Sequence, residues 1–180
     1  MPNIAIISGS PSASSRLNGI VEGLQAELLE AGAAVQIITL RELPPEDLIY
    51  TKFDSPFITK ALGEIEKADA VVVATPIYKA SYTGVVKCFL DMIPQKGLLG
   101  KATLPVVIGG TIGHLLVIDY ALKPVLAAIG AKHQLQGIFA QDTQVARNED
   151  GSFQLADELT ERIQNSVKEL IHDLHLYKNN

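Results

Sequence analysis

Serine side chains crowd the segment that follows the first apolar run of the chain. Residues 8–18 read SGSPSASSRLN, with five serines, one arginine and no carboxylate. Hydroxyl groups and free backbone N–H groups at the start of a helix donate to a phosphate, and the helix dipole favours the negative charge. A guanidinium neutralises part of that charge. We therefore expect a terminal phosphate to be bound here by Ser10, Ser12, Ser15 and Arg16.

The segment is not one of the common nucleotide-binding loops. It matches neither G-x-G-x-x-G nor G-x-x-x-x-G-K-[ST], which disfavours a Rossmann dinucleotide site and a nucleoside triphosphate site. The alternative interpretation is purely structural, a serine-rich turn that caps the following helix. Both interpretations place residues 8–18 at a helix N-terminus.

A second segment with chemical potential, residues 74–84 (ATPIYKASYTG), follows the third apolar run. A proline stiffens this turn, and an aromatic side chain can pack near a flat heterocycle while backbone amides meet the polar edge of the ring. Such an arrangement suits the isoalloxazine ring of a flavin. The expected binding residues are Pro76, Ile77, Tyr78 and Lys79. Taken alone, Tyr78 and Tyr82 fit ordinary half-buried aromatics equally well.

Glycines close the fourth apolar run, where residues 109–114 read GGTIGH. Glycine permits close backbone approach and unusual φ angles, so a ring could lie against this turn. We expect Gly109, Gly110 and Thr111 to contact the same flavin. A Gly-Gly pair is a weak signal by itself, because glycines routinely close turns between strands and helices.

Apolar residues then keep helical spacing straight through Pro124. Because Pro124 has no N–H, the carbonyl of Tyr120 loses its helical partner, and a kink or a π-bulge is the usual accommodation. Tyr120 lies at this irregularity and off the apolar stripe. We interpret it as an interface or active-site residue rather than a plain surface tyrosine.

A sheet must position these segments. Short apolar runs rich in branched residues alternate with stretches of helical periodicity, which is typical of repeated βαβ units. The expected strands are residues 4–8, 35–40, 70–75, 105–109 and 135–140, and the expected helices are residues 20–28, 58–68, 86–93, 115–129 and 159–174. This pattern predicts an α/β fold, a doubly wound five-stranded parallel sheet in the order 2-1-3-4-5 with helices on both faces. Ligands then bind at the carboxyl ends of strands 1 and 3.

The remaining segments carry less information. Residues 41–57 contain two consecutive prolines and no sustained periodicity, so we expect a long ordered loop. The polar tail, residues 177–180, is expected to fray. At 180 residues and 47% apolar content, residues 1–180 are expected to form one domain.

Composition narrows the class of function. The net charge of −5 looks like ordinary solubility and does not favour a nucleic-acid role. The start MPNIAIISGS has an apolar run too short for a signal peptide or a membrane span, so we expect a cytoplasmic protein with no membrane association. One cysteine and four histidines without metal-ligand spacing predict neither a disulfide nor a metal site.

Together these segments resemble the NAD(P)H-dependent FMN reductases, and most closely the alkanesulfonate-assimilation FMN reductases of two-component monooxygenase systems. The resemblance covers nearly the whole chain. It runs through Gly9-Ser10-Pro11, Asp47-Leu48 to Tyr50, Phe53-Asp54-Ser55-Pro56, Thr75-Pro76-Ile77-Tyr78-Lys79, Gly109-Gly110-Thr111 and Asp119-Tyr120-Ala121-Leu122-Lys123-Pro124-Val125-Leu126.

The resemblance implies a flavodoxin-like fold, with FMN as an exchangeable substrate and NADPH or NADH as the reductant. It implies that FMNH2 passes to a partner FMNH2-dependent monooxygenase, which releases sulfite from organosulfonates. It also implies a homo-oligomer, a tetramer, in which Tyr120 lies in a π-helical insertion at the interface near the flavin. One departure concerns Ser12, where relatives often have arginine, so Arg16 must carry more of the phosphate charge.

Two other classes of function remain open on the sequence. One is a quinone, azo or metal reductase that retains FMN and passes its electrons to a second substrate. The other is a flavodoxin-type electron carrier that does not use NAD(P)H. Retention of flavin through purification distinguishes both from a reductase that releases its flavin.

Overall fold

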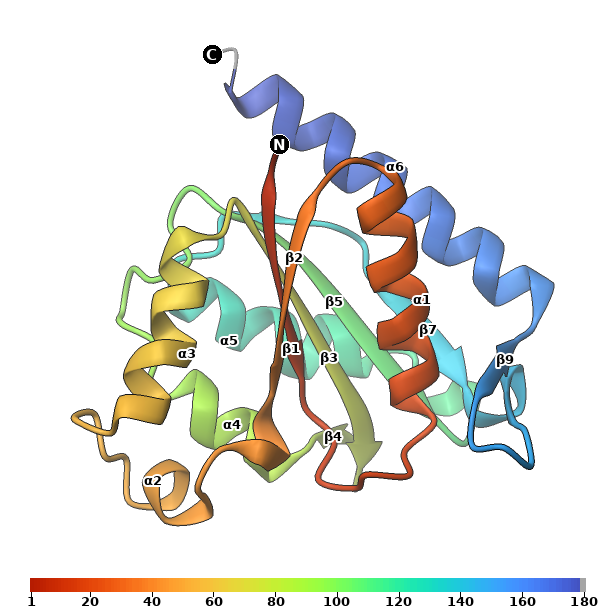
Figure 1. Cartoon of the computed structure of the whole chain (residues 1–180), viewed down its shortest axis with the longest axis horizontal. Helices are drawn as coiled ribbons and strands as arrows, with labels where there is room; N and C mark the ends of the chain where they lie inside the picture. The colour runs from red at the N-terminus through yellow and green to blue at the C-terminus, as the bar shows by residue number, and fades with distance from the viewer. Residues whose placement is uncertain (179–180) are drawn as a thin grey trace.

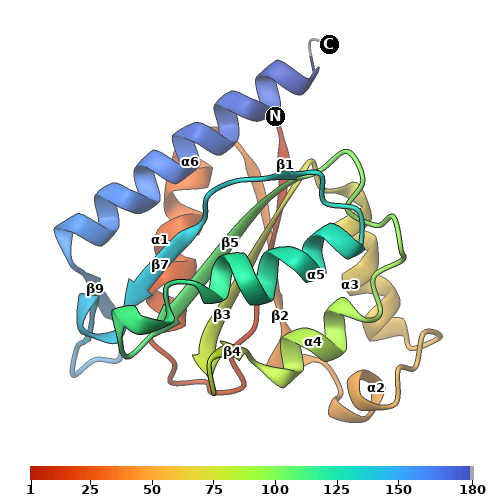
Figure 2. The ribbon, with the colours of Figure 1, turned by 180° about the vertical axis from the view of Figure 1, so that it is seen from behind.

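The structure, a computed structural model, describes residues 1–178 and has a central sheet with helices on both faces (Figures 1 and 2). The parallel strands are β1 (Asn3–Ser8), β2 (Ala34–Thr39), β3 (Ala70–Tyr78), β5 (Ala102–Gly109), β6 (His133–Gln134) and β7 (Ile138–Gln141). They follow the order β2-β1-β3-β5-β6, and β7 also pairs with β5. This confirms the doubly wound α/β fold and puts the carboxyl ends of β1 and β3 side by side.

Helices cover the sheet in two layers. They are α1 (Leu17–Glu30), α2 (Pro45–Ile49), α3 (Pro56–Lys67), α4 (Gly84–Leu90), α5 (Lys123–Ala128) and α6 (Asp157–Lys178). Figures 1 and 2 show α1 and α6 on one face of the sheet and α3, α4 and α5 on the other. None of the helices in residues 1–178 combines the length and the apolar character needed to cross a bilayer.

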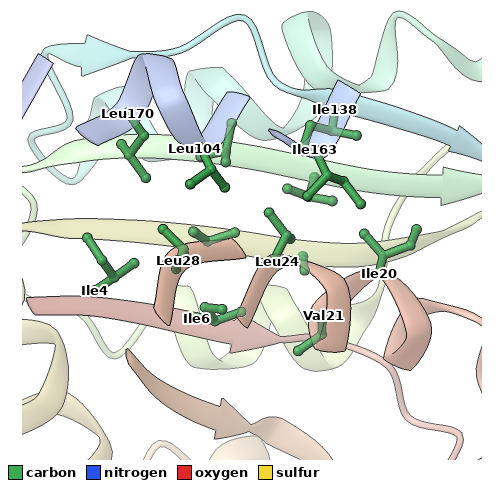
Figure 3. Packing of buried hydrophobic residues seen from close by; sticks show 14 of the residues in the cluster. Ile4, Ile6, Ile20, Val21, Leu24, Leu28, Leu104, Ile138, Ile163 and Leu170 are labelled. Carbon is green, nitrogen blue, oxygen red and sulfur yellow. The ribbon is translucent and has the colours of Figure 1, made fainter. Parts of the chain in front are cut away.

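Alternation along β1 divides the core between the two faces. Ile4 and Ile6 belong to the cluster under α1 and α6, while Ala5 and Ile7 belong to the opposite cluster. Figure 3 shows Leu28 and other α1 side chains packed over Ile4 and Ile6. Burying an aliphatic side chain of this kind contributes about 1.5–3 kcal/mol. The two apolar layers therefore hold the sheet in place from both faces. The loops that follow its strands at the carboxyl edge start from fixed positions.

The fifth strand is broken, which corrects the continuous strand expected over residues 135–140. Both β6 and β7 pair with β5, but residues 135–137 lie between them. The N–H of Leu135 donates to the carbonyl of Thr103, so the backbone of Thr103 faces the fifth strand. Pro105, two residues further along β5, faces the same way but has no N–H to donate. Gly137 adopts a φ of 97° there, and a Cβ on it would lie 2.7 Å from the Pro105 oxygen. The hydrogen-bond ladder between β5 and the fifth strand is therefore interrupted at Pro105.

Residues 41–57 are ordered but not free of helix, which corrects that prediction. A 3-10 turn, η1 (Leu40–Glu42), precedes α2, and α3 begins at Pro56. Pro45 occupies the first position of α2, where a missing N–H costs nothing, and a five-residue helix is too short to show periodicity.

Side-chain bonds hold this segment in place. The Ser55 hydroxyl donates to Asp47 at 2.6 Å, and Lys52 Nζ lies 3.1 Å from the same carboxylate. The hydrogen bond from Ser55 first, and the bond from Lys52 second, lower the pKa of Asp47 below its usual value.

The sequence analysis did not predict several short strands. β4 (Ser81–Tyr82) pairs antiparallel with the end of β3, and β8 (Val145–Arg147) pairs with β9 (Phe153–Leu155). α6 (Asp157–Lys178) includes residues 177 and 178, which corrects the expectation that they fray. The rest of that expected tail, residues 179 and 180, lies outside the described residues.

The expected irregularity before Pro124 is confirmed as a π-helical turn. After the 3-10 turn η2 (Ile112–His114), the chain forms η3 (Ile118–Leu122), a π-helix that runs directly into α5. The N–H of Lys123 donates to the carbonyl of Ile118, five residues earlier. Pro124 thus follows a widened turn instead of breaking the helix.

Candidate active site

The loop after β1 is fixed against the end of β3. The Gly9 N–H donates to the Ala74 carbonyl at 2.8 Å, and the Thr83 hydroxyl donates to the Gly9 carbonyl at 2.7 Å. A Cβ on Gly9 would lie 2.1 Å from Val86 Cγ2, so only glycine fits this approach. The serine loop therefore starts from a set position beside the turn after β3.

Serine hydroxyls shape the loop itself. Ser10 is 2% exposed, and its Oγ accepts from the Ser12 N–H at 3.2 Å. Ser12 Oγ lies 3.2 Å from Ser14 Oγ, and Ser15 Oγ accepts from the Leu17 N–H at the start of α1. The N-cap residue of α1 is Arg16 and makes no side-chain cap bond, so Ser15 bonds the first helical N–H without being the N-cap. Ser12 is partly exposed and Ser14 is exposed.

Arg16 is anchored at one edge of its guanidinium. Its Nε donates to the Val145 carbonyl at 3.0 Å, which ties the first turn of α1 to β8. Among the described residues, no hydrogen bond or ion pair engages its two terminal nitrogens. The side chain is exposed, so these nitrogens are available to an anion.

A crevice of about 240 Å³ opens between the serine loop and the ends of the central strands. Its lining brings together eight of the residues predicted from sequence: Ser12, Ser15, Arg16, Pro76, Ile77, Tyr78, Gly109 and Gly110. The remaining lining residues are Ser14, Ile108 and Asp142. Four segments far apart in the chain thus meet at the carboxyl edge of the sheet, three of which were expected there from the strand order.

Tyr78 stands at the end of β3 with half of its side chain exposed. It begins a tight hairpin in which Tyr78 pairs with Ser81. The two turn residues, Lys79 and Ala80, have φ angles of 49° and 63°, as a type I′ turn requires, although neither is glycine or asparagine. The surrounding contacts must stabilise this backbone, and they hold the tyrosine at the mouth of the crevice.

Four predicted site residues lie outside the crevice lining. Ser10 is buried under the loop, Lys79 lies in the hairpin turn, and Thr111 accepts from the Gly113 N–H at the start of η2. Tyr120 lies in η3 and is 78% exposed. Tyr120 therefore lies on the molecular surface and outside the crevice lining.

Sequence reasoning missed Asp142, Ser14 and Ile108 as lining residues. The signal for Asp142 was available, because it comes two residues after the last predicted strand, residues 135–140, and the carboxyl ends of parallel strands share one edge. It was overlooked because the segment has no glycine or serine pattern of its own.

The donor set of the crevice fits the phosphate of FMN. Its lining combines serine hydroxyls and a free guanidinium edge next to the N-terminus of α1 with the half-exposed aromatic side chain of Tyr78. The volume of about 240 Å³ lies below the range of about 300–1,000 Å³ usual for pockets that enclose a whole ligand. The crevice is thus of a size for the phosphate and its attached chain rather than for a whole flavin.

Comparison with known proteins agrees with this geometry. The sequence profile of the family described as NADPH-dependent FMN reductase matches residues 2–146. The chain is 42% identical over 166 residues to an FMN reductase (NADPH) of Pseudomonas putida, covering 92% of this chain and 84% of that protein. It is 43% identical over 142 residues to an FMN reductase (NADPH) of Escherichia coli K12, covering 79% and 74% of the two chains.

A solved structure points the same way. The apo form of the NADH:FMN oxidoreductase EmoB superposes with a TM-score of 0.84 at 34% identity, covering 94% of this chain and 88% of that one. Its fold, the profile match over residues 2–146 and the assembled crevice agree. The chain belongs to the NADPH-dependent FMN reductase family of oxidoreductases.

Proposed function

We propose that the protein reduces free FMN to FMNH2 with NADPH or NADH, and that the reduced flavin passes to an FMNH2-dependent monooxygenase that desulfonates organosulfonates. The observation that carries the proposal is the crevice that joins the serine loop and Arg16 to the exposed Tyr78. Relatives named FMN reductase (NADPH) support the reductase step. The proposed role in sulfonate assimilation rests on the sequence resemblance alone. The proposed location of the protein is the cytoplasm.

The chain's own residues act by positioning. When bound, the flavin and the nicotinamide supply hydride transfer between their rings. Ser12, Ser14 and Arg16 would hold the phosphate, and Pro76 and Tyr78 at the end of β3, with Gly109 at the end of β5, would orient the ring. Stacking of two rings supplies proximity and orientation, so no side chain is needed as an essential acid or base.

An open crevice suits a flavin that binds and dissociates in each catalytic cycle. The ring side of the site is bordered by the half-exposed Tyr78 rather than by a closed pocket. We propose that a homo-oligomer, a tetramer, completes the cover. Exposed apolar side chains in the π-turn and in the residues just before it support this proposal, namely Ile112, Leu115, Leu116 and Tyr120.

A steady-state assay with varied FMN on the apo-protein tests the proposal. With saturating NADPH or NADH, the rate should saturate with free FMN, and FMNH2 should appear in amounts far above the enzyme concentration. A protein that purifies with tightly held flavin and needs a quinone, an azo dye or a metal ion as acceptor would instead be a flavin-retaining reductase. A protein that fails to oxidise NAD(P)H would be an electron carrier.

A further inference from the structure

One carboxylate stands in the crevice among the phosphate donors. Asp142 begins the 3-10 turn η4 (Asp142–Gln144) directly after β7 and lines the crevice together with Ser12, Ser14, Ser15 and Arg16. Its side chain is exposed, and its Oδ2 lies 3.6 Å from the place that a Cβ on Gly110 would occupy. In the part of the chain that the structure describes, no hydrogen bond or ion pair holds this carboxylate.

The segment that carries Asp142 is fixed from both ends. The side chain of Gln144 accepts from the Gln141 N–H at 3.0 Å, which closes the turn around Asp142. Further along, the Val145 carbonyl accepts from Arg16 Nε. The acidic residue and the arginine are thus tied to the same short segment and line one opening. The backbone of Asp142 cannot drift away from the crevice without breaking these bonds.

The charges in the crevice cancel. Among its lining residues, Arg16 and Asp142 are the only ones that carry a formal charge, and the other donors are neutral hydroxyl and amide groups. The phosphate of FMN carries about −1.5 to −2 charges at pH 7. This dianion therefore meets a lining whose formal charges sum to zero.

We infer that Asp142 sets the affinity for FMN, because its negative charge opposes the phosphate and keeps the flavin exchangeable. The inference rests on the proposed use of FMN as a substrate and assigns one residue to that property. Like charges that share a crevice repel each other, and because Asp142 is exposed, added salt screens part of this repulsion. The arginine and the hydroxyls supply recognition of the phosphate, and the carboxylate limits how tightly the phosphate is held.

A carboxylate in this place has one competing role, which is to accept a hydrogen bond from a hydroxyl of the ribityl chain. The two roles predict opposite effects of neutralisation. Removal of repulsion tightens FMN and leaves riboflavin unchanged, because riboflavin has no phosphate. Removal of an acceptor weakens both flavins alike.

The experiment measures flavin binding to the apo-protein by quenching of flavin fluorescence. Asp142→Asn keeps the shape of the side chain and removes its charge, and Asp142→Ala also removes the polar group. For both variants we expect the dissociation constant of FMN to fall about fivefold or more, and that of riboflavin to stay within about twofold. The gain for FMN should shrink as salt is raised, and the release rate of FMN should fall with the dissociation constant. Glu149→Gln, an exposed position in the β8–β9 turn, is the matched control for the change in total charge.

Each other outcome overturns the inference. Weaker binding of both flavins would make Asp142 a ribityl acceptor, and unchanged binding of both would place FMN elsewhere. An equal gain for Asp142→Asn and Glu149→Gln would assign the effect to overall charge. These affinities do not depend on turnover, so failure of the proposed reductase function would show separately, as absence of FMN-saturable NAD(P)H oxidation by the unaltered enzyme.

Discussion

The hydroxyl of Thr83 donates to the carbonyl of Gly9 at 2.7 Å, across 74 positions of sequence. Thr83 is 2% exposed, and its own N–H donates to Thr75 Oγ1 at 3.2 Å. A single buried threonine thus joins the loop after β1 to the turn after β3. The two halves of the candidate flavin site are positioned relative to each other through this pair.

Thr83→Val should therefore loosen the site and the fold together. The substitution leaves the buried Gly9 carbonyl without its partner, which costs about 1–3 kcal/mol. Urea unfolding should show this loss, and the dissociation constant of FMN should rise. Thr59→Val is the control, since Thr59 is exposed. An unchanged unfolding midpoint for Thr83→Val would mean that the bond contributes nothing.

Ala80→Gly should stabilise the protein, against the usual direction of that substitution. Ala80 has a φ of 63°, a conformation that costs a residue with a Cβ about 1–2 kcal/mol and costs glycine little. The comparison is Ala127→Gly, within helix α5, which should lower stability by about 1 kcal/mol. Thermal unfolding of the two variants gives the sign directly, and a lower Tm for both would show that the turn is not strained.

Arg16→Ala should weaken FMN more than riboflavin. Loss of a charge-assisted contact costs about 1.5–3 kcal/mol, which raises the dissociation constant of FMN about tenfold or more. Riboflavin binding should change little. Arg147→Ala removes an exposed arginine of β8 outside the crevice lining and serves as the control. Equal losses for both flavins would assign Arg16 to a structural role through its bond to Val145.

Tyr120→Ala should convert the protein into one that retains flavin. The side chain is 78% exposed on the π-turn, which fits a residue covered by a neighbouring subunit. We expect the variant to purify yellow, to lose turnover with free FMN and to change its oligomer in sedimentation. Tyr50→Ala, at another exposed tyrosine, should do none of this. A colourless Tyr120 variant with normal turnover and an unchanged oligomer would leave only a structural role.

Asp47→Asn should reduce stability in a defined pH window. The hydrogen bond from Ser55, and then the bond from Lys52, lower the pKa of Asp47 from its usual 3.8. A carboxyl with a lowered pKa stabilises the fold fully above its unfolded-state pKa and loses this effect as pH falls through the folded pKa.

The wild type should therefore exceed Asp47→Asn in unfolding free energy at neutral pH, and the difference should vanish in acid. Urea titrations at pH values from 2 to 7 measure the difference. In a double-mutant cycle with Ser55→Ala, part of the effect should disappear. A difference that is constant across the range would exclude the carboxylate charge as its source.

Regular patterns of apolar residues along the sequence predicted the strands and helices. Features that depend on contacts between distant segments were not predicted. Alternation of apolar runs was sufficient for the strand order, and that order brought residues 12–16, 76–78 and 109–110 to one edge. The Thr83–Gly9 bond has no local signature. The break in the fifth strand depends on which side of β5 Pro105 faces, which no single-strand pattern reveals.

A turn was expected in residues 74–84, but the continuation of β3 to Tyr78 and its tight hairpin to β4 were not predicted, for a different reason. Lys79 and Ala80 lack the asparagine or glycine that marks a tight hairpin, so tertiary contacts override local preference there. The π-turn was predictable because its cause, a proline within helical periodicity, lies in the local sequence.

Gly9 limits how this site can change by descent. A Cβ there meets Val86 Cγ2 at 2.1 Å and the Ala74 oxygen at 2.9 Å. A smaller residue at position 86 would relieve the first contact, but the second is with backbone, which no substitution at position 74 removes. At Gly110, by contrast, the nearest atom lies 3.6 Å away. A Cβ at Gly110, in the crevice lining, would make an ordinary van der Waals contact, whereas the loss of Gly9, which lies outside that lining, has no single compensating neighbour.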